Sequence, residues 1–399
     1  MRPLQLATLW GDLATLEILC KDKPIEKIDD DDDDGDSALH QAAIEEHPKI
    51  IAFLADLGAN VNMPNKAKLT AMHEVAYHGN KECVEILLAK GAEVNLADNR
   101  NRNVLFYACM SDSSETATLV LDTLLEQKVP LSEINAKTSQ NRTPLRQAAG
   151  RGFDTVVSKL IQAAQEADDL GSLAINECDK RKGMTSLHRA AWFGKTEVVR
   201  MLLAAGADAT IRSKDGKTAL VLAYEQWALT SQQKAFEDVI SLLIEKDVEA
   251  AKNDAELVAI AAVNGSIRLL KQLVGVGADL NRQDRYGWTP LELLREFQEE
   301  EAGELLKQQG AWAGMLPARW ADDRRTSVSE DGIAIKHTGG DRICISANKP
   351  LPAGLERFYF EMTLKDVEGG NDQTGYAEVA LVSFINIRLV ISLLITSYF

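Results

Sequence analysis

The chain of 399 residues is poor in the features that mark secreted or disulfide-bonded proteins. Its five cysteines are scattered and form no C-x-x-C pair, the spacing on which many zinc and dithiol sites depend. No apolar segment follows the first residues, so we expect no secretory signal. Because unpaired thiols persist where the surroundings are reducing, both absences favour the cytoplasm or the nucleus.

Positive charge is also scarce. The sequence has 44 Lys and Arg against 60 Asp and Glu, which gives a formal net charge of −16. Seven of the negative charges lie in one stretch, residues 29–36, in which Gly35 is the only residue that is not Asp. Because nucleic acids are bound mainly through contacts of Lys and Arg with phosphates, we expect no nucleic-acid partner.

A recognisable catalytic or metal-binding motif is missing as well. His73 and Glu74 begin an H-E-x-x-H pattern, but His78 follows five residues after His73 instead of four and would lie on another helix face. Residues 30–35 resemble the opening of a calcium loop, yet its twelfth position holds Gln41 in place of Glu. The sequence therefore predicts no catalytic residue, no cofactor and no metal, and a protein that is not an enzyme.

What the chain does contain is a periodic pattern of apolar residues, each followed by a helix-like A-A-x-x-G segment or a degraded copy of it. The marker positions are Leu39, Met72, Leu105, Leu145, Leu187, Leu220, Val258 and Leu291, at spacings of 33, 33, 40, 42, 33, 38 and 33. A period near 33 predicts units of two short helices that must stack on their neighbours to bury their apolar faces. The longer spacings predict extra loops near 111–116, 165–173 and 227–234.

The clearest unit, residues 179–211, carries the motif G-M-T-S-L-H-R-A-A from Gly183, a breaker at Gly194, apolar pairs at 198–199 and 202–203, and a G-A-D ending. It resembles the ankyrin repeat. Good further matches span 37–62, 70–95, 143–176 and 289–311, weaker ones begin near 103, 218 and 256, and residues 4–19 resemble a capping unit. The resemblance implies a mainly α fold, an ankyrin-repeat solenoid with β-hairpin tips. About nine units, with degenerate caps at both ends, would occupy residues 1–314.

Beyond a linker at 315–325, the pattern changes to short alternating strands separated by turn residues. The segments V-S-E-D-G at 328–332, N-K-P-L-P at 348–352 and F-Y-F-E-M at 358–362 resemble the start of a SPRY domain of the B30.2-like kind. Since such a domain is about twice as long, the resemblance implies only a partial antiparallel β-sandwich over residues 326–382.

The last residues, 383–399, are strongly apolar around a central Arg388. One interpretation is a translated intron, because Val382-Ser383 can be encoded by the consensus start of an intron. The other is a tail anchor, although an Arg at the centre of a membrane helix costs about 2.5–3.5 kcal/mol. The position of Arg388 favours the intron.

In the ankyrin family the hairpin tips and the exposed side of each first helix form the partner surface, which implies site residues by register. Aromatic or ring-bearing candidates are Trp10, Tyr77, His78, Trp192 and Phe193. Exposed aromatic side chains often dominate binding energy, but partial burial between helices is an equal alternative. By contrast, His40, His73 and His188 share a position that the family uses to hydrogen-bond neighbouring turns, so we expect them to be structural.

Basic residues gather in the fourth and fifth repeats. They are Arg142, Arg146, Arg151, Lys180, Arg181, Lys182 and Arg189. An acidic or phosphorylated peptide would suit this group. The alternatives are an ordinary solvated face, or contact with the chain's own residues 29–34. Arg285, Tyr286 and Trp288 form a further candidate cluster on the last hairpin.

The sequence thus predicts an adaptor or scaffold of the cytoplasm or nucleus that binds other proteins through two modules. A tail-anchored membrane tether facing the cytosol is the first alternative, and a membrane contact is expected only in that case. The second alternative is a substrate-recognition subunit of a ubiquitin ligase, suggested by analogy with other module pairs.

Overall fold

The computed structural model describes residues 3–21, 28–227, 229, 233–283, 289–297 and 300–311, together with four short strands. The chain divides into two compact units. The first comprises residues 1–226 and 232–247, and the second comprises residues 227–231 and 248–399. Each unit is considered by itself below.

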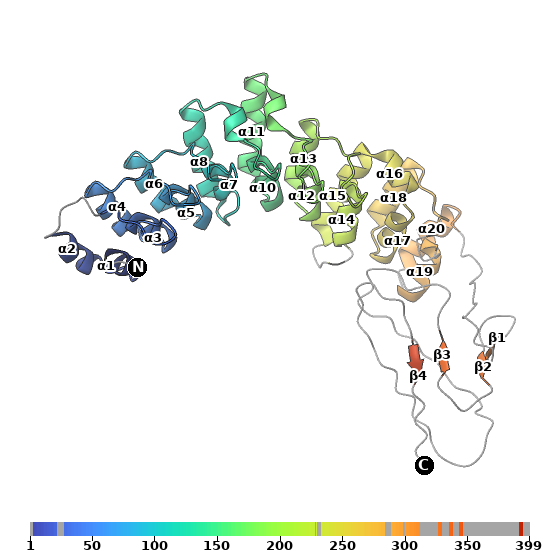
Figure 1. Cartoon of the computed structure of the whole chain (residues 1–399). Coiled ribbons are helices and arrows are strands. Elements are labelled where there is room, and N and C mark those ends of the chain that lie inside the picture. Colours follow the sequence, from blue (N-terminus) through green and yellow to red (C-terminus); the bar gives the residue numbers. More distant parts are fainter. Residues whose placement is uncertain are drawn as a thin grey trace, which may run out of the picture. The chain divides into compact units, whose positions relative to one another are not determined.

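Within the described residues, the helices form nine antiparallel pairs (Figure 1). The pairs are α1 (Pro3–Leu9) with α2 (Leu13–Lys21), α3 (Ala38–Ile44) with α4 (Pro48–Asp56), α5 (Ala71–His78) with α6 (Lys81–Ala89), α7 (Val104–Ala108) with α8 (Ser114–Glu126), α10 (Pro144–Arg151) with α11 (Asp154–Glu166), α12 (Ser186–Trp192) with α13 (Thr196–Ala204), α14 (Ala219–Trp227) with α15 (Gln233–Lys246), α17 (Ala255–Val263) with α18 (Ile267–Val276), and α19 (Pro290–Phe297) with α20 (Glu300–Gln308). Three short elements follow second helices: α9 (Leu131–Ile134), η2 (Leu170–Leu173) and α16 (Val248–Asn253).

The first helices begin at side-chain caps. Ser37, Thr143 and Thr185 each accept a hydrogen bond from the backbone N–H three residues ahead, and Asn103 does the same for α7. Such caps satisfy amide groups that have no partner inside the helix. The glycine expected after the second helices is also found, as at Gly206, whose φ of +89° lies in the left-handed region.

Apolar burial joins successive pairs in the first unit. The first helices α3, α5 and α7 pack in one row, and the second helices α4, α6, α8, α11 and α13 pack in another (Figure 1). Small residues such as Ala42, Ala43 and Ala76 are fully buried between first helices, while Leu54 and Leu87 are fully buried on second helices. No pair could bury these faces alone, which explains why the array has one continuous core.

Between one pair and the next, the chain forms a hairpin tip, and the first unit contains six: residues 29–36, 62–69, 95–102, 135–142, 176–183 and 210–217. A polar side chain closes each tip by accepting backbone N–H bonds: Asp32, Asn65, Asp98, Thr138, Asp179 and Ser213. Each tip also bonds the next through its backbone. The pairs are Lys66 N to Asp34 O, Asn99 N to Ala67 O, Ser139 N to Arg100 O, Lys180 N to Gln140 O and Lys214 N to Lys182 O, at 2.9–3.3 Å. The tips therefore form one ordered edge.

This close approach leads to a prediction for Gly183. Its φ is +67°, and a Cβ there would lie 2.9 Å from the backbone N of Lys214, which donates to the tip before it. Gly183→Ala should therefore cost about 2 kcal/mol, combining left-handed strain with a backbone collision. Gly216→Ala is the matched control, since Gly216 has a φ of +75° but open space, and it should cost about 1 kcal/mol. Urea unfolding of the full chain measures both, and equal losses would contradict the collision.

The expected extra loops are confirmed only in part. The fourth unit carries its extra residues partly in α11, which has 13 residues, and partly after it, in the turn that contains η2. The prediction for the third unit is wrong, because α7 and α8 start ten residues apart, the same interval as α5 and α6. The additional residues instead lengthen α8 to 13 residues and form α9. A helix can absorb an insertion by adding a turn, which the spacing alone does not reveal.

The carboxyl-terminal part has four described strands. β1 (Thr326–Val328) pairs antiparallel with β2 (Ile335–His337), and β3 (Ile343–Ile345) pairs antiparallel with β4 (Ile391–Leu393). The remaining residues of the expected partial SPRY domain, 326–382, and of the tail, 383–399, lie outside the described residues, as do the boundaries at 314, 325 and 382. Among the helices that the structure describes, none is long and apolar enough to cross a membrane.

Candidate partner-binding surface

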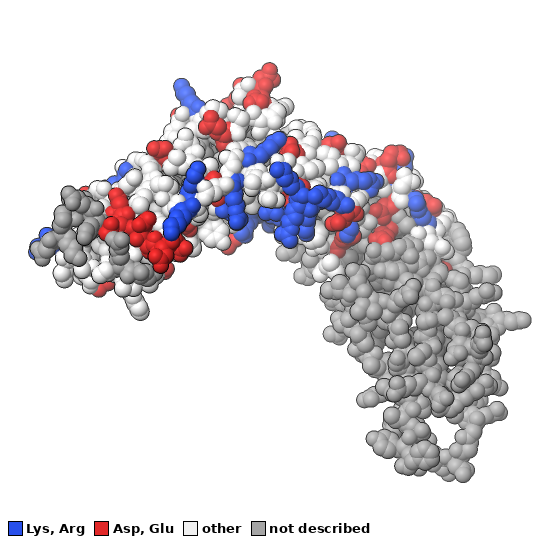
Figure 2. Space-filling view, in the orientation of Figure 1, with Lys and Arg blue, Asp and Glu red and all other residues white. Residues whose placement is uncertain are grey.

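Exposed Lys and Arg side chains gather on the ordered edge of hairpin tips, which carries about half of the exposed basic residues that the structure describes in the first unit (Figure 2). The second to sixth tips, here called the basic edge, hold twelve Lys and Arg against four acidic residues. The cations are Lys66, Lys68, Arg100, Arg102, Lys137, Arg142, Lys180, Arg181, Lys182, Arg212, Lys214 and Lys217, and the acids are Asp98, Glu177, Asp179 and Asp215. In a chain of net charge −16, this edge is therefore a local excess of positive charge.

The first tip has the opposite charge. Residues 29–36 contain seven Asp and no base, and Asp32 closes the tip by accepting from the backbone N–H groups of Asp34 and Asp36. The lysine of the second tip, Lys66, donates to the backbone oxygen of Asp33. The same edge of one unit therefore runs from strongly acidic to strongly basic.

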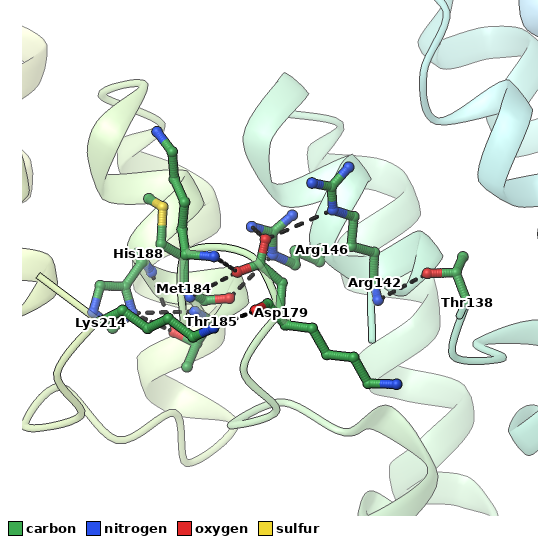
Figure 3. Close-up of polar contacts among 10 residues, drawn as sticks. Thr138, Arg142, Arg146, Asp179, Met184, Thr185, His188 and Lys214 are labelled. Atoms are coloured by element: carbon green, nitrogen blue, oxygen red, sulfur yellow. Dashed lines mark hydrogen bonds and ion pairs between the residues drawn. The ribbon is translucent and has the colours of Figure 1, made fainter. Parts of the chain in front are cut away.

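The structure corrects the prediction for Arg146. This residue of α10 is 4% exposed, and its side chain reaches toward the fifth tip (Figure 3). Its Nη2 donates to Asp179 Oδ2 at 3.0 Å, and its Nε donates to the backbone oxygen of Met184 at 3.1 Å. Arg146 thus joins two units, and its buried guanidinium is not available to a partner. It therefore does not belong to the predicted binding surface.

The position of Arg146 explains its burial. It is the third residue of α10 after the cap Thr143, the position that His188 holds after Thr185. His188 Nε2 donates to the oxygen of Lys217, the residue before the next cap, and Arg146 makes the same contact with Met184. Arginine therefore replaces histidine in one unit and adds an ion pair. Sequence reasoning missed this because Arg146 was grouped by charge, although the T-x-x-H register could have revealed it.

The histidines of this register are structural, as expected. Nε2 of His40, His73 and His188 donates to a backbone oxygen of the next unit, at 3.0, 3.2 and 3.1 Å. Each Nδ1 accepts from the backbone N–H of its own cap residue, which fixes a neutral ring with the proton on Nε2. Burial lowers the pKa of His73 to about 4 and also lowers the pKa of His188.

The aromatic candidates differ in exposure. Trp10 is 80% exposed, Tyr77 45% and Phe193 42%, whereas Trp192 is half-buried. His78 is exposed, and its Nδ1 lies 3.7 Å from a carboxylate oxygen of Glu46 in the preceding unit. Partial burial therefore applies most to Trp192 and to a lesser degree to Tyr77 and Phe193, whereas Trp10 is largely accessible.

Two of the remaining basic candidates lie close to these rings. Lys182 Nζ is 5.6 Å from the centre of the Trp192 ring, and Arg189 Cζ is 5.1 Å from that of Phe193. Such cation–π contacts hold a cation in place while leaving it accessible to an anion. Arg151 is exposed and pairs with Asp112 of another unit, and Arg181 is exposed on the fifth tip. Arg285, Tyr286 and Trp288 lie outside the described residues.

Metal chemistry finds no support in the described part of the chain, where no group of His, Cys, Asp and Glu could hold an ion. His73 and His78, which begin and end the H-E-x-x-x-H segment, have separate roles: His73 is buried in the inter-unit contact and His78 is exposed. What the first unit offers chemically is a charged and aromatic surface.

Comparison with known proteins agrees with the repeat geometry. A family model described as ankyrin repeats (many copies) matches residues 39–88, and one described as ankyrin repeats (3 copies) matches residues 120–213 and 174–254. These segments are ankyrin repeats. Proteins with such repeats bind other proteins, and the SPRY resemblance has no counterpart among these matches.

Several curated proteins are similar to this chain over part of its length. A palmitoyltransferase, AKR1, of Lachancea kluyveri is 28% identical over 55% of this chain and 28% of its own length. The ankyrin repeat and KH domain-containing protein mask-1 of Caenorhabditis elegans is 27% identical over 61% of this chain and 10% of its own length. Human transient receptor potential cation channel subfamily A member 1 is 26% identical over 51% of this chain and 18% of its own. The chain thus covers less than a third of each relative.

Solved structures similar to the chain include the ankyrin repeat domain of human ASB11, with a TM-score of 0.46 and 22% identity. Another is the ankyrin repeat domain of Bcl-3, with a TM-score of 0.42 and 23% identity. In both comparisons 61% of this chain and 98% of the solved chain are covered.

Sequence reasoning found the cations of the fourth and fifth repeats but missed the rest of the basic edge. Lys66, Lys68, Arg100 and Lys214 are exposed on other tips, and Lys137 is exposed on the fourth tip, which also holds Arg142. They are far apart in the chain, and only the tip-to-tip bonds bring them to one edge. The available signal was the repeat register: each lies within a few residues of the polar side chain that closes its tip.

Proposed function

We propose that the chain is a protein-interaction adaptor whose ankyrin repeats bind an acidic segment of a partner protein along the basic edge. The observation that carries this proposal is the excess of twelve cations over four acids on five successive tips, against a net charge of −16. An acidic segment would meet cations at every tip, and the exposed ring of Phe193 adds apolar area at the fifth repeat.

The charge reversal at the first tip supports a defined orientation. The seven Asp of residues 29–36 would repel an acidic segment and attract a basic one. A partner that follows the edge should therefore be acidic where it meets the second to sixth tips and neutral or basic where it meets the first. A partner bound in the reverse orientation would bring its acidic part to the acidic first tip, so that orientation is disfavoured.

The experiment is a binding assay with the full chain and a fluorescent Asp/Glu-rich peptide, compared with an Asn/Gln peptide of equal length. The acidic peptide should bind selectively, and its affinity should fall about tenfold between low and high salt as screening shortens the reach of the charges. Replacing Lys180, Arg181 and Lys214 together with Gln should weaken binding about tenfold.

A matched triple variant controls for net charge. Lys49, Lys81 and Arg200 are exposed on the second helices α4, α6 and α13, so replacing them with Gln removes the same charge from another face. This variant should bind the acidic peptide within about threefold of the wild type. Equal losses from both triple variants would show that only net charge matters and would contradict a specific edge.

The finer alternatives remain predictions. A membrane tether depends on residues 383–399, and a SPRY module on residues 326–382, most of which lie outside the described residues. Membrane fractionation of the full chain tests the tether. For the adaptor, and for a substrate-recognition subunit of a ubiquitin ligase, we propose the cytoplasm or the nucleus as its location.

A further inference from the structure

Three arginines of the fourth and fifth repeats surround one buried carboxylate. Arg146 and Asp179 form the close pair described above, and Arg142 Nε lies 3.6 Å from the same oxygen of Asp179. Arg189 makes no ion pair among the described residues. Since Asp179 also accepts from the backbone N–H groups of Lys182 and Met184, its single charge is already fully engaged. The cluster therefore carries about two positive charges without compensation.

Two donors in this cluster make no hydrogen bond with a described residue, although Arg142 Nε keeps its longer ion pair with Asp179. The Nε atoms of Arg142 and Arg189 are buried and make no hydrogen bond within the described part of the chain. A buried donor of a charged group is costly unless an acceptor or an ion satisfies it, and such an orphan in a native protein needs an explanation. Burial, together with Arg142, lowers the pKa of Arg189, which shows that this guanidinium would gain from a nearby anion.

Arg189 is held in a fixed place. Its guanidinium lies over the ring of Phe193 on one side, and a Cβ added to Gly150 would come within 2.9 Å of its Nε on the other. The corresponding register carries Tyr77 in the second repeat and Trp192 in the fifth, both large. A glycine inside a helix destabilises the fold by about 1 kcal/mol relative to alanine. Gly150 therefore needs an explanation, and the space that it leaves for Arg189 provides one. A guanidinium ordered before binding loses less entropy when it meets an anion.

We infer that Arg142 and Arg189 form a binding site for a phosphoryl group, carried by a phosphoserine or phosphothreonine in the acidic segment of the partner. This inference rests on the proposed function, because the same segment brings the phosphate to the cluster. A phosphate carries a charge of about −2 and three acceptor oxygens, which match two excess charges and several free N–H groups. A single carboxylate would leave one positive charge uncompensated.

A peptide fits the cluster better than a membrane or a nucleic acid. An anionic bilayer or a long polyanion lying along the edge would also meet the seven Asp of residues 29–36. A short segment at the fourth to sixth tips avoids that repulsion. The rings of Phe193 and Trp192 beside the cluster offer contacts for peptide side chains, with Phe193 42% exposed.

The test uses the full chain and two fluorescent peptides with the same Asp/Glu-rich flanks, one with a central phosphoserine and one with serine. We expect the phosphopeptide to bind at least about tenfold more tightly. Arg189→Gln should abolish this difference while leaving the binding of the serine peptide within about threefold. The double variant Lys180→Gln, Arg181→Gln removes charge from the exposed tip and should weaken both peptides to the same extent.

Gly150→Ala provides a variant that keeps every charge. The added Cβ should displace the Arg189 guanidinium from its place against α10, so the preference for the phosphopeptide should fall about as far as in Arg189→Gln. The urea midpoint should rise, because alanine is the better helix former. A loss of phosphate preference in a more stable protein cannot be ascribed to unfolding.

The outcomes separate the two proposals. Equal affinity of the wild type for both peptides, or an unchanged preference in Arg189→Gln, overturns the phosphoryl site and leaves the acidic-segment function standing. If neither peptide binds, both proposals fail. Binding of a single-stranded oligonucleotide or of phosphatidylserine vesicles that depends on Arg189, without a peptide preference, would assign the site to another class of partner and overturn the inference.

Discussion

Asp179→Asn should lower the free energy of unfolding of the full chain by about 3 kcal/mol. Asparagine keeps an oxygen for the backbone N–H groups of Lys182 and Met184, so the fifth tip retains its closing bonds. It removes the negative charge that faces Arg146, which is 4% exposed. Breaking a buried pair from one side typically costs about 3–5 kcal/mol, because the remaining charge stays buried without a partner.

The charge of Asp179 is secured over the whole ordinary pH range. Burial alone would raise its pKa, but the backbone donors of Met184 and Lys182, together with Arg146 and Arg142, outweigh burial and hold the pKa below its usual value. Its contribution is therefore present above about pH 4 and is lost only as the pH falls further. The effect of the substitution should accordingly be the same at pH 7 and pH 6.

Asp98→Asn is the matched control in the third tip. Asp98 closes its tip in the same way and pairs with Arg102, but the Arg102 side chain is 23% exposed and can be hydrated once the pair is broken. Because Asp98 Oδ2 also accepts from the buried Tyr107 hydroxyl, we expect a cost of about 1–2 kcal/mol, still below that of Asp179→Asn. Urea unfolding by circular dichroism measures both variants, and equal costs would show that the burial of Arg146 does not set the penalty.

Arg146→His offers a rescue. Histidine is the residue of this register in three other units, where it bridges to the next turn without a charge. Combined with Asp179→Asn, it removes the unpaired cation, so the double variant should recover about 2 kcal/mol relative to Asp179→Asn alone. Strictly additive losses would contradict the coupling of Arg146 with Asp179.

Sequence reasoning predicted the features that depend on residues close together in the chain, and it missed those that depend on distant residues. The helix pairs, the histidine register and the glycine that ends α13 follow from local chemistry repeated at a fixed period, so they could be predicted. The burial of Arg146 could not be read from its charge, because it depends on a carboxylate 33 residues away, in the next unit. The basic edge likewise depends on bonds between tips, which no single repeat contains.

The orphan donors illustrate the same limit within the candidate site. A sequence shows that Arg142 and Arg189 are basic, but not that their Nε atoms are buried and make no hydrogen bond with the residues that the structure describes. Nor does it show that Gly150 in α10 leaves room for a side chain of α12. What distinguishes a binding site from a solvated charged face here is the combination of burial, fixed geometry and missing partners, and all three arise from stacking.

The second large effect concerns pH. Stability should fall by about 2 kcal/mol between pH 7.5 and pH 5 because of His73 alone. Burial lowers the pKa of His73 to about 4, while the unfolded chain should titrate near 6.5. The unfolded state therefore binds the proton more readily, and acid favours unfolding. The loss begins as the pH falls through about 6.5 and is complete, at about 3 kcal/mol, below pH 4.

The geometry gives the reason. His73 Nδ1 accepts from the backbone N–H of Thr70, and Nε2 donates to the oxygen of Leu96. A protonated ring would direct a second N–H against the Thr70 amide, at a fully buried position where the Thr70 hydroxyl, 3.0 Å from Nδ1, is the nearby group that could accept it. Nearby Asp98 raises the pKa of His73, whereas Arg102 and His40 lower it, so the surrounding charges do not rescue the imidazolium.

His73→Gln tests this account. A T-x-x-Q box keeps a polar side chain that can reach back to the cap, as Glu292 does for Thr289 in the last unit, but it cannot titrate. The variant should be less stable than the wild type at pH 7.5 yet lose about 2 kcal/mol less on going to pH 5.

Glu74 works in the opposite direction, since burial raises its pKa and acid then favours folding, so it cannot produce the loss. Asp98 and Asp179 have lowered pKa values and stay ionised in this window. If wild type and variant show parallel pH profiles, the acid sensitivity lies elsewhere and His73 is not the buried proton acceptor.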